Sequence, residues 1–189
     1  MSQADLIDRA RRGDDAAWLR LVGEHQDGVF RLAYLLLANA DDAEDAAQET
    51  FVRAYQALDR FDSARPLRPW LLSIAANLAR NRRRAIGRYL AAVGRFFQTR
   101  EEPPVTAPPS DAYWQQQAAQ GVWRAVQRLR PQDQEMIYLR YFLELSVAET
   151  AEAANLPAGT VKSRLHRALG RLRTVIETEF PDLVEQRIE

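Results

Sequence analysis

Side chains able to bind nucleic acid are concentrated between Ala158 and Arg173, a stretch with five cationic residues and no acid. At about 100° per residue, one helix face collects the polar side chains. That face consists of Ser163, His166, Arg167 and Gly170, flanked by Lys162 and Arg164. Such donors can bind base edges in the major groove and phosphates beside it. The alternative is an ordinary helical hairpin with a solvated basic face.

The residues around this face predict a helix-turn-helix. Ser146 and Glu149 form an S-x-x-E capping box that begins one helix. Asn155-Leu156-Pro157 ends it, and Pro157 is tolerated in the first turn of the next helix. The second helix has an apolar stripe: Val161, Leu165, Ala168, Leu169, Leu172 and Ile176. A short helix, a tight turn and a basic helix are typical of this DNA-binding motif.

The composition argues against an enzyme. The 189 residues include no cysteine and two histidines, His25 and His166, so disulfides, thiolate zinc sites and cysteine nucleophiles are excluded. No glycine-rich phosphate loop is present, and we expect no catalytic residues, no cofactor and no metal. No apolar run is long enough to cross a membrane, and residues 1–15 lack the apolar core of a signal peptide. We therefore expect a cytoplasmic protein without membrane insertion.

The formal net charge is zero, but the charges are segregated. Residues 41–49 hold five acids and no base, whereas residues 80–100 hold seven arginines and no acid. Helix capping and solubility explain the acids adequately; a docking surface for a basic partner is the alternative. Arg80, Arg82, Arg83, Arg84 and Arg88 exceed what the end of a helix needs, which favours a second nucleic-acid surface over a solvated helix end.

Hydrophobic periodicity predicts an all-α fold of two small helical domains joined by a flexible linker that contains prolines. In the first domain, residues 1–86, we expect helices over residues 5–12, 16–37, 42–61 and 70–85. The linker is residues 87–110, where two proline pairs occur. The second domain, residues 111–178, has helices over 111–130, from Pro131, and across the helix-turn-helix. A polar tail, residues 179–189, follows.

The order of these elements resembles the extracytoplasmic-function (ECF) group of sigma-70-like RNA polymerase sigma factors. Three strings carry the resemblance: DDAEDAAQETFVRAY (41–55), RPWLLSIAANLARNRRR (68–84), and LRPQDQEMIYLRYFLELSVAETAEAANLPAGTVKSRLHRALGRLR (129–173). The resemblance implies that the first domain is sigma region 2, a helical bundle, and that the second is sigma region 4, with the helix-turn-helix.

The resemblance also implies residue roles. Four residues of the acidic helix match positions that grip the β′ coiled coil of the polymerase: Asp45, Gln48, Glu49 and Arg53. The following loop and helix match positions that capture a flipped base of the −10 promoter element and hold the DNA backbone: Phe61, Asp62, Ser63, Asn77, Arg80, Arg83 and Arg84. The family's loop usually carries a glycine, and this one does not. In region 4 the residues that match −35 contacts are Arg140, Lys162, Ser163, His166 and Arg167.

The function implied by the resemblance is promoter-specific transcription initiation. The chain is expected to bind core RNA polymerase through the β′ coiled coil and the β flap, recognise both promoter elements and help to open the DNA, acting as a monomer. An anti-sigma factor is an expected partner and could hold the chain at the inner face of the membrane. The alternative is a conventional dimeric helix-turn-helix transcriptional regulator, which predicts a palindromic site.

Overall fold

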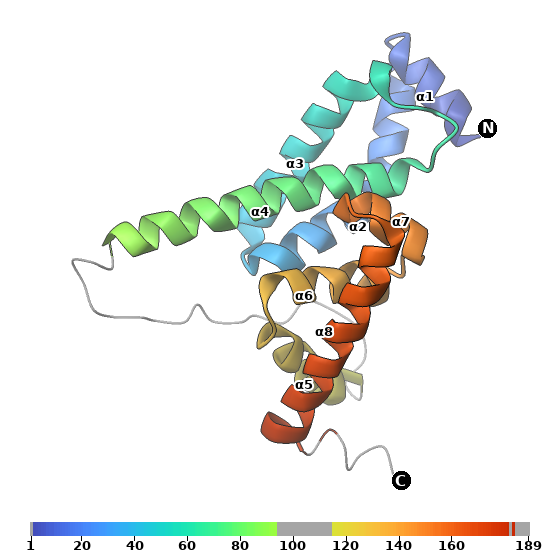
Figure 1. The fold of residues 1–189 in the computed structure, drawn as a ribbon. Coiled ribbons are helices and arrows are strands. Elements are labelled where there is room, and N and C mark those ends of the chain that lie inside the picture. The colour runs from blue at the N-terminus through green and yellow to red at the C-terminus, as the bar shows by residue number, and fades with distance from the viewer. Residues whose placement is uncertain (1, 94–114, 182, 184–189) are drawn as a thin grey trace. The chain divides into compact units, whose positions relative to one another are not determined.

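The computed structural model describes residues 2–93, 115–181 and 183. Every regular element in these ranges is helical, which confirms the all-α prediction. The chain divides into two compact units near residue 102 (Figure 1). Residues 94–110 of the expected linker, the first residues of the expected helix over 111–130, and most of the expected tail lie outside the described residues.

The first unit begins with three helices whose starts are each fixed by a side-chain cap. They are α1 (Gln3–Arg11), α2 (Asp15–Leu37) and α3 (Ala40–Ala57). The caps are Ser2, Asp14 and Asn39, and each accepts a hydrogen bond from a backbone N–H of the first turn. Such caps stabilise a helix by about 1 kcal/mol each. The predicted breaks between these helices are confirmed to within about two residues.

The core of the first unit is built around α2, which packs against α1, α3 and α4. Small side chains line its contact with α3, where Ala33 and Tyr34 meet Ala43 and Ala46. Leucines fill the rest of the interior, and several are at most 1% exposed: Leu21, Leu32, Leu71 and Leu72. Burying one such side chain contributes about 1.5–3 kcal/mol, so these contacts fix the outward faces of α3 and α4.

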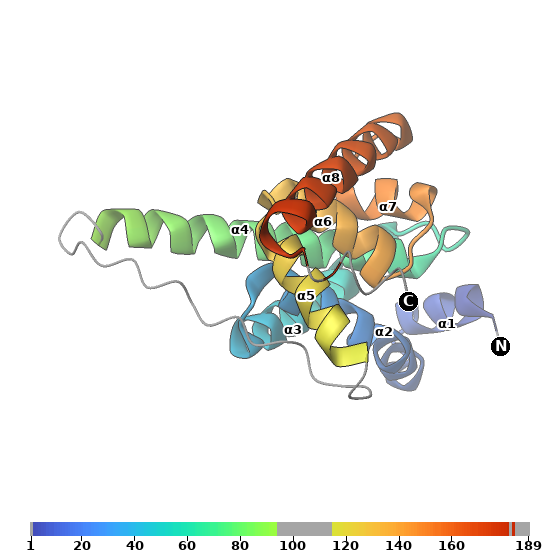
Figure 2. The same cartoon turned by 90° about the horizontal axis from the view of Figure 1, so that it is seen from below.

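A short 3-10 helix, η1 (Leu58–Arg60), and a loop lead from α3 into α4 (Leu67–Val93). Pro66 precedes α4 and Pro69 lies in its first turn, where a missing N–H costs no hydrogen bond. The helix was expected to end near Ala85, but it continues through Gly87 to Val93. Residues 87–93 of the expected linker are therefore helical, and this end of α4 extends beyond α2 and α3 in both views (Figures 1 and 2).

The second unit is built on α5 (Gln115–Gln127), α6 (Pro131–Ile137) and α8 (Ala158–Glu179), with α8 packed against both of the others. After α6 the chain forms a π-helix, η2 (Tyr138–Phe142). Trp123 and Tyr138 stack with ring centroids 5.6 Å apart in its core. Arg171 Nη1 donates a hydrogen bond to Asp133 Oδ2 over 2.7 Å, which ties α8 to the first turn of α6.

The hairpin of α7 (Val147–Ala154) and α8 forms as the sequence predicts. The capping box is confirmed, because Ser146 N–H donates to Glu149 Oε2 over 2.8 Å and Glu149 N–H donates to Ser146 Oγ over 3.2 Å. Asn155 takes the left-handed conformation, with φ of 54°, that asparagine tolerates better than most residues. Pro157 occupies the N-cap of α8, one position before the first turn that was expected for it.

Candidate functional site

Asp45, Gln48, Glu49 and Arg53 share one face of α3, because residues three and four apart are neighbours on a helix. Asp45, Gln48 and Arg53 are exposed and Glu49 is half-buried. Glu49 Oε1 accepts a hydrogen bond from Arg53 Nε over 2.7 Å. The structure therefore places these four side chains together on an accessible surface, and their contact with the polymerase stays a prediction. Two carboxylates with one internal cation suit a positively charged partner.

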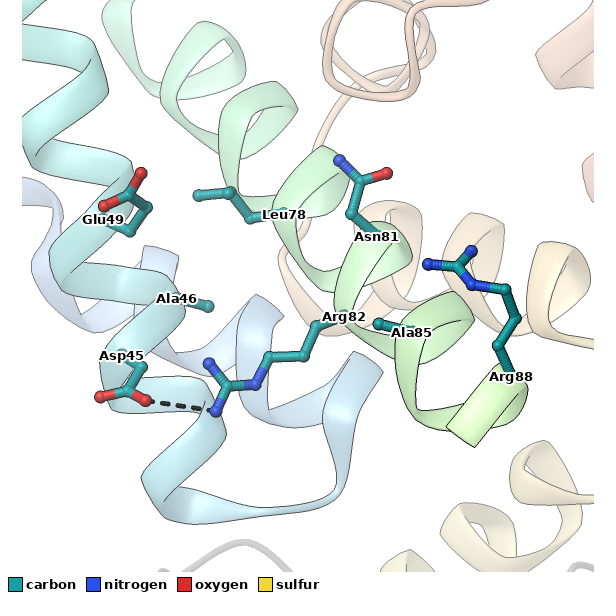
Figure 3. A pocket seen from close by; sticks show the side chains of 8 residues that line it. All are labelled: Asp45, Ala46, Glu49, Leu78, Asn81, Arg82, Ala85 and Arg88. Atoms are coloured by element: carbon teal, nitrogen blue, oxygen red, sulfur yellow. Dashed lines mark hydrogen bonds and ion pairs between the residues drawn. The ribbon is translucent and has the colours of Figure 1, made fainter. Parts of the chain in front are cut away.

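A groove of about 540 Å³ separates this face from α4 (Figure 3). Its α3 wall carries Asp45 and Glu49, its α4 wall carries Arg82 and Arg88, and Ala46, Leu78 and Ala85 supply apolar lining. Arg82 Nη2 lies 3.2 Å from Asp45 Oδ2, and the same nitrogen also donates to Asp42 Oδ1. Arg82 is thus engaged by the acids of α3.

The loop between η1 and α4 is ordered by its own polar contacts. Asp62 Oδ1 accepts from Ala64 N–H over 3.0 Å, and Asp62 O accepts from Arg65 N–H over 3.0 Å. The Phe61 ring is buried, 4.5 Å from Trp70 between ring centroids. We expected Phe61 among the DNA-contacting residues; its ring instead anchors the loop. Of the predicted contacts in the loop, Asp62 is exposed and Ser63 is half-buried, and Ala64, Arg65 and Pro66 are exposed beside them.

Asn77 and Arg84 are exposed on α4, and Arg80 and Arg83 are half-buried. Arg80 Nη2 donates to Asn77 Oδ1, one turn earlier on the helix. This contact orients the amide, so Asn77 would offer a base chiefly its Nδ2 donors. Arg84 Nη2 donates in the same way to Asn81 Oδ1 over 2.6 Å. The structure therefore brings together two amides and a row of guanidinium groups, which suits DNA backbone and base edges.

The polar face of α8 is arranged as the helical period predicts. Lys162, Ser163, His166 and Arg167 are all exposed. Arg167 Nε donates to Ser163 O over 3.1 Å, and the rest of its guanidinium belongs to this exposed face. The stripe was correct at Val161, Leu165 and Ala168, which are buried, but wrong at Leu169, which is 39% exposed. Leu169 lies at the edge of the face of α8 that packs against α5 and α6.

Arg140 is placed differently from the other predicted contacts of the second unit. It lies in η2, is half-buried, and donates from Nη1 to Leu145 O over 3.1 Å. Its guanidinium carbon lies 5.5 Å from the centroid of the Tyr141 ring, which is half exposed. Arg140 therefore supports the loop before α7, and only part of its guanidinium remains for a phosphate.

Comparison with known proteins shows the family to which this chain belongs. Residues 21–89 match Sigma-70 region 2, and residues 119–172 match Sigma-70 region 4. ECF RNA polymerase sigma factor SigW of Bacillus subtilis is 35% identical over 173 residues, which cover 88% of this chain and 92% of SigW. This chain belongs to the ECF RNA polymerase sigma factors.

Other relatives agree. The ECF RNA polymerase sigma-E factor of Salmonella typhimurium is 31% identical over 195 residues, covering 96% of this chain and 95% of that protein. The solved structure of CnrH in complex with the cytosolic domain of CnrY matches with a TM-score of 0.68 at 26% identity, covering 94% of this chain and 98% of that chain. RpoE of Bartonella quintana, solved with the anti-sigma factor NepR, shares the fold with a TM-score of 0.69 at 24% identity, covering 85% of this chain and 96% of that chain.

Family membership establishes the general function of this ECF sigma factor, which is promoter-specific transcription initiation with RNA polymerase. It does not favour the conventional dimeric regulator. Sigma factors are generally not enzymes, and the described residues contain no cluster of His, Cys, Asp or Glu able to hold a metal ion. Within the same described ranges, no helix has both the length and the apolar character needed to span a membrane.

One buried ionisable group lies apart from these surfaces. His25 on α2 lines a cavity of about 280 Å³ together with Glu24, Arg68 and Leu72. Its Nε2 is buried and has no hydrogen-bond partner among the described residues. Burial lowers the pKa of His25 below its ordinary value; the Glu24 carboxylate opposes this shift and the Arg68 cation adds to it. His25 is therefore a half-buried histidine whose neutral form is favoured, and nothing in the sequence predicts the burial of its Nε2.

Proposed function

We propose that this sigma factor divides promoter recognition between its two units. The α3 face of Asp45, Gln48, Glu49 and Arg53 binds the β′ coiled coil of core RNA polymerase. The loop at Asp62 and Ser63, with Asn77, captures a flipped base of the −10 element. Flipping costs a few kcal/mol, and the α4 cations offset part of it by holding the backbone. The exposed face of α8 reads the −35 element in the major groove.

The observation that carries this proposal is the separation of charge across the first unit. Acids face outward from α3, whereas the cations that follow Asn77 belong to α4. Arg82 pairs with Asp42 and Asp45 of α3, and we assign the other predicted cations of α4 to the DNA-directed surface. One small domain can then bind a basic protein helix and an anionic strand at the same time, as promoter opening by a polymerase-bound factor requires.

The same proposal includes further partners and the way in which the factor acts. The second unit also docks on the β flap, and the factor acts as a monomer on two unlike elements. It performs no bond chemistry, needs no cofactor, and leaves catalysis to the polymerase. We propose that an anti-sigma factor holds it in the cytoplasm, at the inner membrane face where that factor is membrane-anchored. The related CnrH, solved with the cytosolic domain of CnrY, supports a protein partner of this kind.

The polymerase-binding role is tested by titrating the labelled full-length chain with core RNA polymerase. Glu49→Ala should weaken the complex about tenfold or more, because it removes an interfacial charge. Asp41→Ala is the matched control: it removes the same charge from the exposed first turn of α3, and we expect a change of less than about twofold. Equal effects of the two substitutions, or no complex with the wild type, would refute the assignment.

A further inference from the structure

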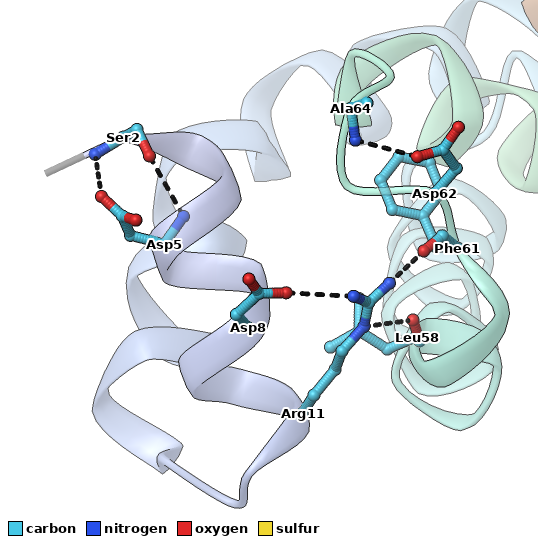
Figure 4. Close-up of polar contacts among 8 residues, drawn as sticks. All are labelled: Ser2, Asp5, Asp8, Arg11, Leu58, Phe61, Asp62 and Ala64. Atoms are coloured by element: carbon cyan, nitrogen blue, oxygen red, sulfur yellow. Dashed lines mark hydrogen bonds and ion pairs between the residues drawn. The ribbon is translucent and has the colours of Figure 1, made fainter.

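Helix α1 precedes residues 21–89, so the match to region 2 assigns it no role. The helix nevertheless contacts the loop proposed to capture the −10 base. Arg11, in its last turn, donates from Nε to Leu58 O over 3.0 Å and from Nη2 to Phe61 O (Figure 4). Its third nitrogen, Nη1, donates to Asp8 Oδ1 over 3.0 Å on α1 itself. One guanidinium thus joins α1 to the first residue of η1, Leu58, and to the C-cap of η1, Phe61.

A second contact holds the far side of the same loop. Gln3 Nε2, in the first turn of α1, lies 3.4 Å from Arg65 O. The loop that contains Asp62 and Ser63 is therefore held at Phe61 by Arg11 and at Arg65 by Gln3. Asp62 supplies the internal turn between these two points.

The helix that makes these contacts is itself firmly placed. Leu6, Ile7 and Ala10 are each at most 2% exposed, so its inner face is part of the core. Ser2 and Asp5 form a complete capping box at its start. Near its end, Arg9 Nη2 lies 2.6 Å from Asp14 Oδ2, the N-cap of α2. Arg11 therefore extends from a fixed support to a loop that has little regular structure of its own.

The chemistry of the contact explains why an arginine is used. The two carbonyls flank the 3-10 helix: Leu58 begins it, and its O also accepts from Phe61 N–H over 3.1 Å, whereas Phe61 is its C-cap. A planar guanidinium can donate to two such acceptors at once in a fixed geometry, and its charge favours the negative end of the helix dipole. Phe61 O belongs to the residue immediately before Asp62, so the backbone that sets the direction of Asp62 is held directly.

We propose that Arg11 is a positioning residue for −10 base selection, holding the Asp62–Ser63 loop in the shape that accepts the flipped base. This inference rests on the proposed function of that loop. Arg11 itself need not touch DNA. Its loss should leave polymerase binding and −35 recognition intact while the loop samples other conformations and discriminates less between bases.

The test uses full-length protein assembled with core RNA polymerase on a promoter found by run-off transcription. Each −10 position is randomised in turn, and the transcripts are sequenced. The wild type should show a strong preference at the captured position. Arg11→Gln should reduce that preference about tenfold, the change expected for loss of a charge-assisted hydrogen bond. Arg11→Lys keeps the charge without the fork and should recover the preference only in part.

Two control variants remove the same charge close to Arg11, at the end of α1. Arg9→Gln breaks the ion pair with Asp14, and Arg12→Gln alters the exposed C-cap residue. Both should keep the wild-type base preference to within about twofold. Affinity for core polymerase and the −35 preference should be the same in all variants, which separates a loop effect from a general loss of folding.

Gln3→Ala provides an independent variant should Arg11→Gln fold poorly. It removes only the contact with Arg65 O, so it should lower the same preference in the same direction by a smaller factor. The inference is overturned if Arg11→Gln and Gln3→Ala retain the full preference, or if Arg9→Gln and Arg12→Gln lower it equally. A wild type without any preference at a single −10 position would overturn the loop's proposed function, and the role of Arg11 with it.

Discussion

Arg82 Nη2 on α4 lies 3.2 Å from Asp45 Oδ2 on α3. The pair connects a residue proposed to bind the polymerase with the helix proposed to bind DNA. Both side chains are more than one-third exposed, so the pair adds little to stability by itself. Its importance is that it engages a cation of α4 with the acids of α3.

We predict that Arg82→Ala changes DNA affinity less than Arg83→Ala does. The polymerase-bound factor should lose less than about threefold in affinity for an opened promoter with Arg82→Ala. With Arg83→Ala, the slope of log affinity against log salt should fall by about one phosphate contact. Fluorescence anisotropy at several salt concentrations measures both quantities. Equal loss for the two variants would show that Arg82 leaves its acids to bind DNA.

Lys162→Ala and Arg167→Ala should each weaken promoter use by about 1–3 kcal/mol, because each removes a donor that can reach a guanine edge or a phosphate. Arg173→Ala is the matched control, since Arg173 is exposed on the same helix, about 16 Å beyond Lys162 and about 9 Å beyond Arg167. Abortive initiation over a range of holoenzyme concentrations measures the effect. If all three variants initiate like the wild type, α8 is not the recognition helix.

Asn77→Ala should reduce promoter opening more than it reduces the first contact with the −35 element. The amide held by Arg80 is proposed to act only on a base that has left the duplex. Permanganate reactivity of unpaired thymines reports opening, and footprinting of the upstream element reports first contact. Asn81→Ala, one turn further along α4, is the control. Parallel losses of opening and upstream contact would contradict a pocket role for Asn77.

The free energy of unfolding should decrease as the pH falls below about 6.5, the ordinary pKa of histidine. His25 has a lowered pKa in the folded protein, so the unfolded chain takes up its proton first and is favoured as the pH falls. His25→Gln should remove this part of the slope, whereas His166→Gln, at an exposed position, should retain it. Urea unfolding between about pH 7.5 and 5.5 measures the slope. An unchanged slope in His25→Gln would contradict the effect of burial.

Local signals predicted most of the helix starts and the polar face of α8. Capping residues such as Ser146 and Asn39 act over three or four positions, so the sequence displays them directly. The exposure of Lys162, Ser163, His166 and Arg167 follows from the helical period alone. The end of α4 was placed too early, because the helix continues through Gly87; a glycine costs only about 1 kcal/mol inside a helix.

Contacts between distant residues could not be predicted in this way. Arg11 is 47 residues from Leu58 and 50 from Phe61, and in sequence it is simply an arginine at a helix end. The same applies to Arg82, which lies 40 residues from Asp42. Neither has a periodic signature, because each depends on how α1, α3 and α4 pack. Ala38, with φ of 55° at the end of α2, shows a similar limit, since glycine is the usual residue there.

Promoter-specific initiation by this chain is tested by adding the purified protein to bacterial core RNA polymerase and measuring run-off transcription from fragmented DNA of the source genome. We expect discrete new start sites whose upstream regions share two unlike elements at a fixed spacing. Substituting Lys162 should affect use of the upstream element, and substituting Asn77 should affect the downstream one. A folded chain that forms a stable complex with core polymerase but produces no new start sites would contradict the account.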